Sequence, residues 1–290
     1  MKTVVVGAGA WGSAFAGVLR DCGHGVTVAD RATIDGAPYE QADLVVIAVP
    51  SAAFRGALGH VRGTAPVLSL TKGLDPATGD RLSTLIRDRP VAVLSGPNMA
   101  EEVAAGLPGA TVIASEDDSL ARRLQEAINS STFRVYVNDD LIGIELCAAA
   151  KNVIALSAGA VDGLGLGDNA KAALITRGLV EMARLGEACG AQPETFSGLA
   201  GMGDLIVSCW HPSGRNRRAG ELIARGASPE EARVEIGHTV EGLTTAPVLR
   251  DLSHRLGIEL PITEGVCAVL GGMQIHELLG SLMGRRPREE

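Results

Sequence analysis

The sequence has few aromatic residues, no excess of positive charge and no long apolar run. Aromatic residues make up 3% of the 290, so small and aliphatic side chains must provide the packing, which favours a parallel sheet and closely packed helices. The formal net charge is −8, whereas nucleic-acid-binding domains normally have a basic face, so we expect no nucleic-acid partner. No uninterrupted apolar stretch reaches the ~18 residues of a membrane span, and we expect none.

Cysteine is scarce and gives no sign of a disulfide framework or a metal site. The cysteines are odd in number, widely spaced and without a C-x-x-C pair: Cys22, Cys147, Cys189, Cys209 and Cys267. No cluster of histidine, cysteine and carboxylate residues has the spacing of metal ligands. We therefore expect reduced thiols, a cytoplasmic location and no metal.

The first half of the chain alternates short apolar runs with helical patterns. Continuous apolarity is typical of strands buried on both faces, and its alternation with helices indicates a parallel, doubly wound sheet. A Rossmann-type domain is therefore predicted over residues 1–140. Its expected strands are Thr3–Val6, Val26–Ala29, Leu44–Val49, Val67–Leu70, Val91–Leu94, Thr111–Ala114 and Phe133–Val137.

After about Leu141 the strand pattern stops and long helical patterns replace it. Two helices are predicted over Ile142–Val161 and Asn169–Cys189, the second with Asp168 as a candidate N-cap. The fold class is thus α/β, a Rossmann-type doubly wound parallel sheet followed by an all-α domain over residues 141–290. We expect only the tail Gly284–Glu290 to be disordered.

A glycine-rich turn follows the first predicted strand and opens a predicted helix. Gly7, Gly9 and Gly12 form the pattern G-x-G-x-x-G, in which glycines permit a tight turn and close approach of a pyrophosphate. Asp30 stands 18 residues beyond Gly12 at the end of the second strand, where a ribose hydroxyl would lie. These residues predict a dinucleotide site, and the alternative is a glycine-rich turn without a ligand.

Polar residues follow two further strands at the edge where ligands bind in such sheets. Lys72 comes after Val67–Leu70 and can meet a phosphate or an oxyanion, although a solvated loop lysine is the alternative. Asn98 follows Val91–Leu94 and is either a site residue or a helix cap paired with Glu101.

Lys151 is the most informative residue because it interrupts an apolar helical pattern. Its helical neighbours are small and apolar, so its ammonium reaches no surface unless it points into a cleft. A desolvated lysine has a lowered pKa and can exchange a proton near neutral pH. The alternative is a lysine that reaches water from the edge of the helix.

Two later segments add an acid and a group of arginines. Asp204 follows a glycine-rich turn, where it could hold a cationic lysine or bond a substrate hydroxyl. Arg215, Arg217 and Arg218 open a predicted helix, where the dipole disfavours positive charge, so they indicate an anion at the helix amino end. A basic surface turn is the alternative.

Several motifs in the same order resemble those of the bacterial NAD(P)-dependent glycerol-3-phosphate dehydrogenase family across nearly the whole length. They are GAGAWG, GLD after Lys72, SGPNMAEEVAAGLP, KNVIALSAGAVDGLGLGDNAKAALITRGLVEMARLG, GLAGMGDL, GRNRRAG and TVEG. By this resemblance the protein is an oxidoreductase and a homodimer that supplies glycerol 3-phosphate for phospholipid biosynthesis.

The resemblance also assigns roles to individual residues. It implies that Lys151 is the catalytic proton donor and acceptor. The implied substrate site contains Lys72, Gly96, Asn98, Lys151, Asp204, Gly214, Arg215 and Asn216. The implied coenzyme contacts, besides the glycine-rich turn, are Ala10, Trp11, Arg31, Lys72, Ala100, Arg215, Thr239 and Glu241.

Three features depart from the family pattern. The connection Ala32–Ala42 has eleven residues, where the family usually carries a much longer one. Gly214 replaces a serine before Arg-Asn, and Asn98 replaces a small hydroxyl residue. Because the short connection leaves little to hold Arg31 over the ribose, we expect Asp30 to set a preference for NAD(H) over NADP(H).

The combined prediction is hydride transfer from NAD(P)H to a small phosphorylated ketone, with dihydroxyacetone phosphate and sn-glycerol 3-phosphate as the leading pair. Lys151 protonates the developing alkoxide, Asp204 orients Lys151, and Lys72 adds positive charge. One alternative is a dehydrogenase of another phosphorylated or carboxylated hydroxy compound. Another is a catalytically silent dinucleotide-binding redox sensor.

Overall fold

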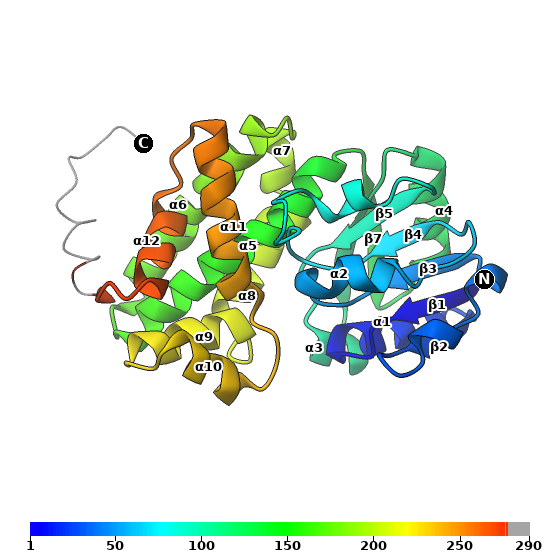
Figure 1. The fold of residues 1–290 in the computed structure, drawn as a ribbon, viewed down its shortest axis with the longest axis horizontal. Coiled ribbons are helices and arrows are strands. Elements are labelled where there is room, and N and C mark those ends of the chain that lie inside the picture. Colours follow the sequence, from blue (N-terminus) through cyan, green and yellow to red (C-terminus); the bar gives the residue numbers. More distant parts are fainter. Residues whose placement is uncertain (276, 278–290) are drawn as a thin grey trace.

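The computed structural model describes residues 1–275 and residue 277, and consists of a sheet with flanking helices followed by a helical domain. In Figure 1 the sheet lies on the right, and the helices that follow it lie on the left. The predicted fold class is confirmed. The predicted disordered tail, Gly284–Glu290, lies outside the described residues.

All the predicted strands are present and form one sheet in the order β2-β1-β3-β4-β5-β6-β7. From β1 the chain goes to β2 on one side and then to β3 on the other, so a crevice forms where these directions diverge. The glycine-rich turn lies at this point, directly after β1. The strands are β1 Lys2–Val6, β2 Gly25–Ala29, β3 Leu44–Ile47, β4 Val67–Ser69, β5 Val91–Ser95, β6 Gly109–Ala114 and β7 Phe133–Asn138.

One strand pairing differs from the parallel arrangement predicted from the sequence. β6 pairs antiparallel to β5, and β7 then pairs parallel to β6. The chain between β5 and β6 holds only the short helix α3, Ala100–Ala104, instead of a long crossover helix. An apolar run shows that a strand is buried but carries no information about its direction, so the sequence could not reveal this reversal.

Helices cover both faces of the sheet. α1 (Ala10–Asp21) and α4 (Asp118–Ile128) pack on one face, and α2 (Ser51–Leu58) packs on the other. Within β1, Val5 packs with Phe15 of α1, whereas its neighbour Val4 packs with Phe54 of α2. This alternation is the two-residue period of a strand and explains why both faces are apolar.

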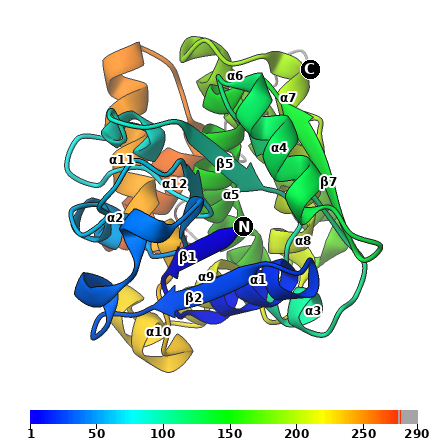
Figure 2. The ribbon, with the colours of Figure 1, turned by 90° about the vertical axis from the view of Figure 1, so that its right-hand side faces the viewer.

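The helical domain is built around the long helix α5, Leu141–Gly163. Its first turns share one apolar core with strand β5, and its later turns pack against the other helices. Figure 2 views the molecule with the sheet in front and the helical domain behind it. The surrounding helices are α6 Gly167–Ala188, α7 Pro193–Phe196, α8 Asp204–Trp210, α9 Arg215–Ala224, α10 Pro229–Ile236, α11 Glu241–Leu256 and α12 Pro261–Leu270.

The two predicted helices agree with α5 and α6 except at their ends. α6 begins at Gly167 and its N-cap position is Leu166, so Asp168 lies in the first turn and is not the cap. A carboxylate in the first turn still interacts favourably with the helix dipole. The prediction of Asp168 as N-cap was therefore wrong, although its charge lies at the favourable end of the helix.

α5 is long and apolar enough, by length and composition, to cross a membrane. However, 89% of its most apolar window is buried inside the protein. Packing within the fold therefore accounts for its apolar surface.

Candidate active site

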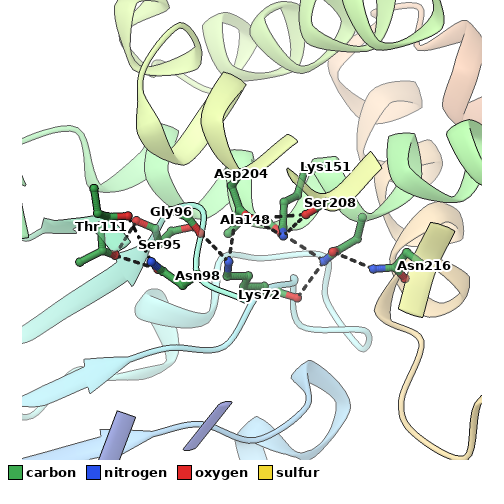
Figure 3. A network of polar contacts seen from close by, with 12 residues as sticks. Lys72, Ser95, Gly96, Asn98, Thr111, Ala148, Lys151, Asp204, Ser208 and Asn216 are labelled. Carbon is green, nitrogen blue, oxygen red and sulfur yellow. Dashed lines mark hydrogen bonds and ion pairs between the residues drawn. The ribbon is translucent and has the colours of Figure 1, made fainter. Parts of the chain in front are cut away.

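The side chain of Lys151 lies at the centre of the candidate site, between the sheet and the helical domain. Lys151 is in the middle of α5 and only 6% exposed. Its Nζ donates to Asp204 Oδ1 at 2.7 Å and to Ser208 Oγ at 2.7 Å, both on α8 (Figure 3). The ammonium therefore points into the protein, and the alternative of a lysine that reaches water does not hold.

Lys72 meets the same carboxylate from the other domain. It follows β4, and its Nζ donates to Asp204 Oδ2 at 2.5 Å and to the carbonyl of Gly96, after β5, at 3.1 Å. Only 17% of its side chain is exposed, so it is not a solvated loop lysine. Figure 3 shows Asp204 between the two ammonium groups.

Burial changes the proton affinity of this cluster. It lowers the pKa of Lys151 to about 8, although the negative charge of Asp204 acts in the opposite direction. Burial alone would raise the pKa of Asp204, but Lys151 and Lys72 outweigh it and the pKa is lowered. Asp204 thus remains a carboxylate, while Lys151 can take up or release a proton near neutral pH.

Asp204 owes its place to an unusual turn at the start of α8. A π-helical turn, Leu199–Gly203, leads directly into α8. At Gly201 a Cβ atom would lie 2.1 Å from the carbonyl oxygen of Phe196, so only glycine fits this close approach. The glycine-rich turn recognised in the sequence therefore aims Asp204 at the two lysines.

Gly96 and Asn98 shape the wall beside Lys72. Gly96 has φ +151°, and a Cβ there would lie 3.0 Å from Thr111 Cα. The Asn98 amide donates to the Ala110 carbonyl at 3.1 Å and accepts from the Thr111 hydroxyl at 3.0 Å. The alternative of a helix cap was wrong, because the N-cap position of α3 is Met99 and has no side-chain cap. Asn98 instead fastens the turn after β5 to β6.

Asn152 belongs to the same network but was missed in the sequence. It is 4% exposed, and its amide donates to the Lys72 carbonyl at 3.4 Å. Asn216 donates to Asn152 Oδ1 at 2.9 Å and accepts from the backbone of Gly242 at 2.8 Å. Asn152 could have been identified from the sequence, because it is a second polar residue beside Lys151 in an otherwise apolar helical pattern.

The arginine-rich segment forms the amino end of α9, but the side chains of Arg215 and Arg217 have different partners. Gly214 is the N-cap residue, and the first turn contains no acid. Arg215 is exposed, and its Nη1 donates to the carbonyl of Thr239 at 3.0 Å. Arg217 turns away from this end and binds Asp162 at 2.6 Å. Arg217 therefore does not belong to the predicted anion site, and Arg215 stays the candidate ligand.

The glycine-rich turn has the shape that a dinucleotide requires. A Cβ at Gly7 or Gly12 would lie 2.4 Å and 2.0 Å from backbone oxygens, whereas at Gly9 nothing lies within 4 Å. Gly9 thus leaves open space at the amino end of α1, which has no side-chain cap and no acid in its first turn. The Trp11 Nε1 is buried without a hydrogen-bond partner among the described residues. These residues fit a bound pyrophosphate and coenzyme.

Asp30 and Arg31 form the turn after β2. Asp30 Oδ1 accepts from Ala32 N at 3.0 Å and from the Thr33 hydroxyl at 2.8 Å. The hydrogen bond from Thr33, followed by those from the backbone, lowers the pKa of Asp30. The turn therefore holds an ionised carboxylate at the strand end, and Arg31 beside it is exposed.

Glu241 joins the two domains at the first residue of α11. Its carboxylate accepts from the Ser51 hydroxyl at 2.7 Å and from the Ser51 backbone N–H at 3.2 Å. Burial raises the pKa of Glu241, and the bonds from Ser51 partly offset this. Ser51, at the amino end of α2, was not identified in the sequence because its partner is 190 residues away. Ala10 and Ala100, which begin α1 and α3, line one groove between these two helices.

Comparison with known proteins assigns both halves of the chain to one family. Residues 34–121 match the model of the NAD-dependent glycerol-3-phosphate dehydrogenase N-terminus, and residues 140–279 match that of its C-terminus. A glycerol-3-phosphate dehydrogenase [NAD(P)+] of Gloeobacter violaceus is 46% identical, covering 100% of this chain and 99% of the relative. The enzyme of that name from Symbiobacterium thermophilum is 51% identical, covering 81% and 71%.

A solved structure agrees with this assignment. The crystal structure of glycerol-3-phosphate dehydrogenase from Coxiella burnetii superposes with a TM-score of 0.92 at 34% identity, covering 98% of this chain and 99% of the other. The similarity therefore includes both domains and the crevice between them.

Proposed function

This chain belongs to the NAD-dependent glycerol-3-phosphate dehydrogenase family, and we propose that it reduces dihydroxyacetone phosphate to sn-glycerol 3-phosphate. The observation that carries the proposal is the carboxylate of Asp204, bound by Lys151 at 2.7 Å and by Lys72 at 2.5 Å. A ketone oxygen that becomes an alkoxide needs a proton and nearby positive charge, and these two lysines can supply both. When bound, NAD(P)H supplies the hydride.

Each residue of the cluster has a separate role in this proposal. Lys151 donates its proton to the C2 oxygen of the substrate during reduction and takes it back during oxidation. Asp204 orients Lys151 and keeps it charged until the proton is needed. Lys72 adds positive charge beside the oxygen and the phosphate. The Ser208 hydroxyl fixes the Lys151 ammonium from its other side.

The phosphate is proposed to bind at the amino end of α9. Arg215 offers a two-pronged guanidinium, and the first backbone N–H groups of the helix add donors. Asn216 lies next to Arg215 and connects this end to Asn152 and Lys72. Gly214 contributes no hydroxyl, so we expect a weaker hold on the phosphate than in relatives with serine there.

The direct test is the oxidation of NADH by the purified protein, followed by the loss of absorbance of the reduced coenzyme. Dihydroxyacetone phosphate should be reduced faster than dihydroxyacetone, glyceraldehyde 3-phosphate or a 2-oxo acid. A faster reaction with another compound would replace the proposed substrate. No reaction with any of them, together with tight coenzyme binding, would favour a silent redox sensor.

NADH is proposed as the better coenzyme because Asp30 stands at the end of β2. A carboxylate there bonds ribose hydroxyls and repels a 2′-phosphate. The expected preference in kcat/KM for NADH over NADPH is about tenfold or more, levelled or reversed in Asp30→Gly. A preference of the unaltered protein for NADPH would instead assign the selection to Arg31.

Further properties are proposed from the resemblance to the family. We propose a homodimer, testable by light scattering on the eluting protein, and a cytoplasmic location, with which the free state of all the cysteines agrees. Supply of glycerol 3-phosphate for phospholipid biosynthesis would follow from the reaction. The division into domains at residues 140 and 141 is likewise proposed, with α5 contributing to the cores of both.

A further inference from the structure

Arg217 lies in the first turn of α9, two residues after Arg215, but its side chain leads away from the proposed phosphate site. Its Nη1 donates to Asp162 Oδ2 at 2.6 Å, near the end of α5. Its Nε donates to the His211 carbonyl and its Nη2 to the Pro212 carbonyl, each at 3.2 Å. All three guanidinium nitrogens are therefore engaged, and 13% of the side chain is exposed.

The position of this guanidinium is favourable for two other helices. Positive charge in the first turn of α9 opposes the dipole of that helix. However, the carbonyl of His211 lies at the end of α8, and Asp162 lies in the last turn of α5. A cation at the carboxyl ends of two helices is stabilised by both dipoles. Arg217 thus ties the end of α8, the end of α5 and the start of α9 together.

The loop His211–Gly214 that precedes Arg215 has little freedom. Gly214 N donates to the His211 carbonyl at 3.0 Å, closing a tight turn. A Cβ at Gly214 would lie 3.1 Å from both the His211 and the Ser208 carbonyl oxygens. Because Gly214 is the N-cap of α9, any shift of this loop also moves Arg215 and the helix end.

Asp162, which belongs to α5 and binds Arg217 of α9, is also held in place by α6. Lys171 of α6 donates to it at 2.8 Å and lies 4.7 Å from the centre of the Trp210 ring. Burial alone would raise the pKa of Asp162, but the bonds from Lys171 and Arg217 lower it. The lowered pKa favours the ionised form of Asp162, which anchors Arg217.

The backbone around Arg217 is equally constrained. A Cβ at Gly159 of α5 would lie 1.7 Å from the carbonyl oxygen of Arg217. The start of α9 is thus pressed directly against α5, and its position is fixed by contact as well as by the guanidinium.

We propose that Arg217 is a positioning residue for phosphate recognition. It holds the loop His211–Gly214 so that Arg215 and the amino end of α9 face the substrate phosphate. A lysine could keep the ion pair with Asp162, but its single ammonium nitrogen cannot take the separate positions of Nε, Nη1 and Nη2 from which Arg217 bonds Asp162 and the two carbonyl oxygens. This inference rests on the proposed function, in which Arg215 binds the phosphate.

The test compares three conservative variants of the full-length protein: Arg217→Lys, Arg215→Lys and Arg225→Lys. Arg225 is the matched control, because it lies at the other end of α9 and binds Glu221 at 2.6 Å, as Arg217 does at 3.2 Å. We would measure kcat, KM for dihydroxyacetone phosphate and for NADH, and the protection by inorganic phosphate against thermal unfolding.

Arg217→Lys should raise KM for dihydroxyacetone phosphate about tenfold, because the lost positioning costs about as much free energy as one strong hydrogen bond. The concentration of inorganic phosphate needed to protect the protein against thermal unfolding should rise to a similar degree. Its kcat and its KM for NADH should stay within about twofold, and its kcat/KM for unphosphorylated dihydroxyacetone should not change. Arg225→Lys should behave as the unaltered protein. If Arg217→Lys does not accumulate as folded protein, Asp162→Asn should give the same pattern with a smaller rise in KM.

The outcomes separate this inference from the proposed function. Unchanged KM for dihydroxyacetone phosphate in Arg215→Lys would remove Arg215 from phosphate binding and with it the proposed site. A raised KM in Arg215→Lys with an unchanged KM in Arg217→Lys would overturn only the positioning role. A lower kcat together with similar rises in KM for dihydroxyacetone phosphate and for NADH would show that Arg217 merely supports the fold. That result would also overturn the positioning role.

Discussion

The carboxylates of Asp204 and Asp162 each bind two cationic side chains, but in different surroundings. Asp204 accepts hydrogen bonds from Lys72 and Lys151 in the crevice between the domains. Asp162 accepts hydrogen bonds from Lys171 and Arg217 at the end of α5. The side chain of Asp204 is 2% exposed and that of Asp162 is 24% exposed. Both clusters combine one negative and two positive side chains. They differ in burial, and the Asp162 cluster contains an arginine where the Asp204 cluster has a second lysine.

The difference determines what each cluster can do. Burial lowers the pKa of Lys151 to about 8, so the Asp204 cluster can exchange a proton near neutral pH. The planar guanidinium of Arg217 bonds several acceptors at fixed angles. The Asp162 cluster therefore holds the geometry of three helix ends. The Asp204 cluster is suited to proton transfer, and the Asp162 cluster is suited to positioning the loop His211–Gly214.

The largest expected effect comes from removing the lysine of the Asp204 cluster. Lys151→Ala should lower kcat about 10²–10⁴-fold, because a positioned acid is lost together with positive charge at the oxygen. The dissociation constant for NADH, measured by fluorescence titration, should stay near that of the unaltered protein.

Lys171→Ala is the matched control for this change. Lys171 is a buried lysine that also binds an aspartate, but it lies outside the crevice. Its loss should leave kcat within about threefold, since no proton passes through it. If Lys151→Ala kept half of the normal kcat, or if both variants lost turnover equally, the two clusters would not differ in function.

The pH dependence of turnover should show the same contrast. Lys151 must be protonated to donate in reduction, and its pKa is lowered to about 8. The kcat for reduction should therefore be constant well below pH 8 and fall about tenfold per unit above it. The oxidation of glycerol 3-phosphate needs the neutral amine, so its kcat should rise up to about pH 8 and then level off.

This pH profile can be assigned to Lys151 by two comparisons. The residual activity of Lys151→Ala should lack the inflection, whereas Asp162→Asn should keep it unchanged. A reduction rate that stays constant beyond pH 9.5 would mean that the lysine is not the proton donor, or that its pKa is not lowered in the coenzyme complex.

Much of the Asp204 cluster could be predicted from the sequence because each member breaks a local pattern. Lys151 interrupts an apolar helix, and Asp204 follows a glycine-rich turn. Lys72 follows a buried strand, at the edge where parallel strands bring functional residues together. Local irregularity therefore identified residues that lie 132 positions apart in the chain, as Lys72 and Asp204 do.

The Asp162 cluster was not predicted, because none of its members stands out locally. Asp162 and Lys171 occur near helix ends, where charged residues are common. Arg217 was grouped with its neighbouring arginines, since residue order does not show which way a side chain turns at the start of a helix. The reversed direction of β6 was missed for a similar reason, because strand direction depends on the path of the connection and not on apolarity.

The last expected effect concerns stability and compares the two carboxylates directly. Asp204→Asn leaves Lys72 and Lys151 buried without a negative partner, which should lower the free energy of unfolding by about 3–5 kcal/mol. Asp162→Asn should lower it by only about 1 kcal/mol, because solvent reaches this site and Arg217 keeps its bonds to the His211 and Pro212 carbonyls. For a chain of this size about 1 kcal/mol corresponds to a decrease of roughly 2–4 °C in Tm.

Thermal unfolding of both variants at pH 7 measures the difference. Equal decreases would mean that burial does not distinguish the two clusters, and that the less deeply buried Asp162 cluster contributes as much to folding as the one in the crevice.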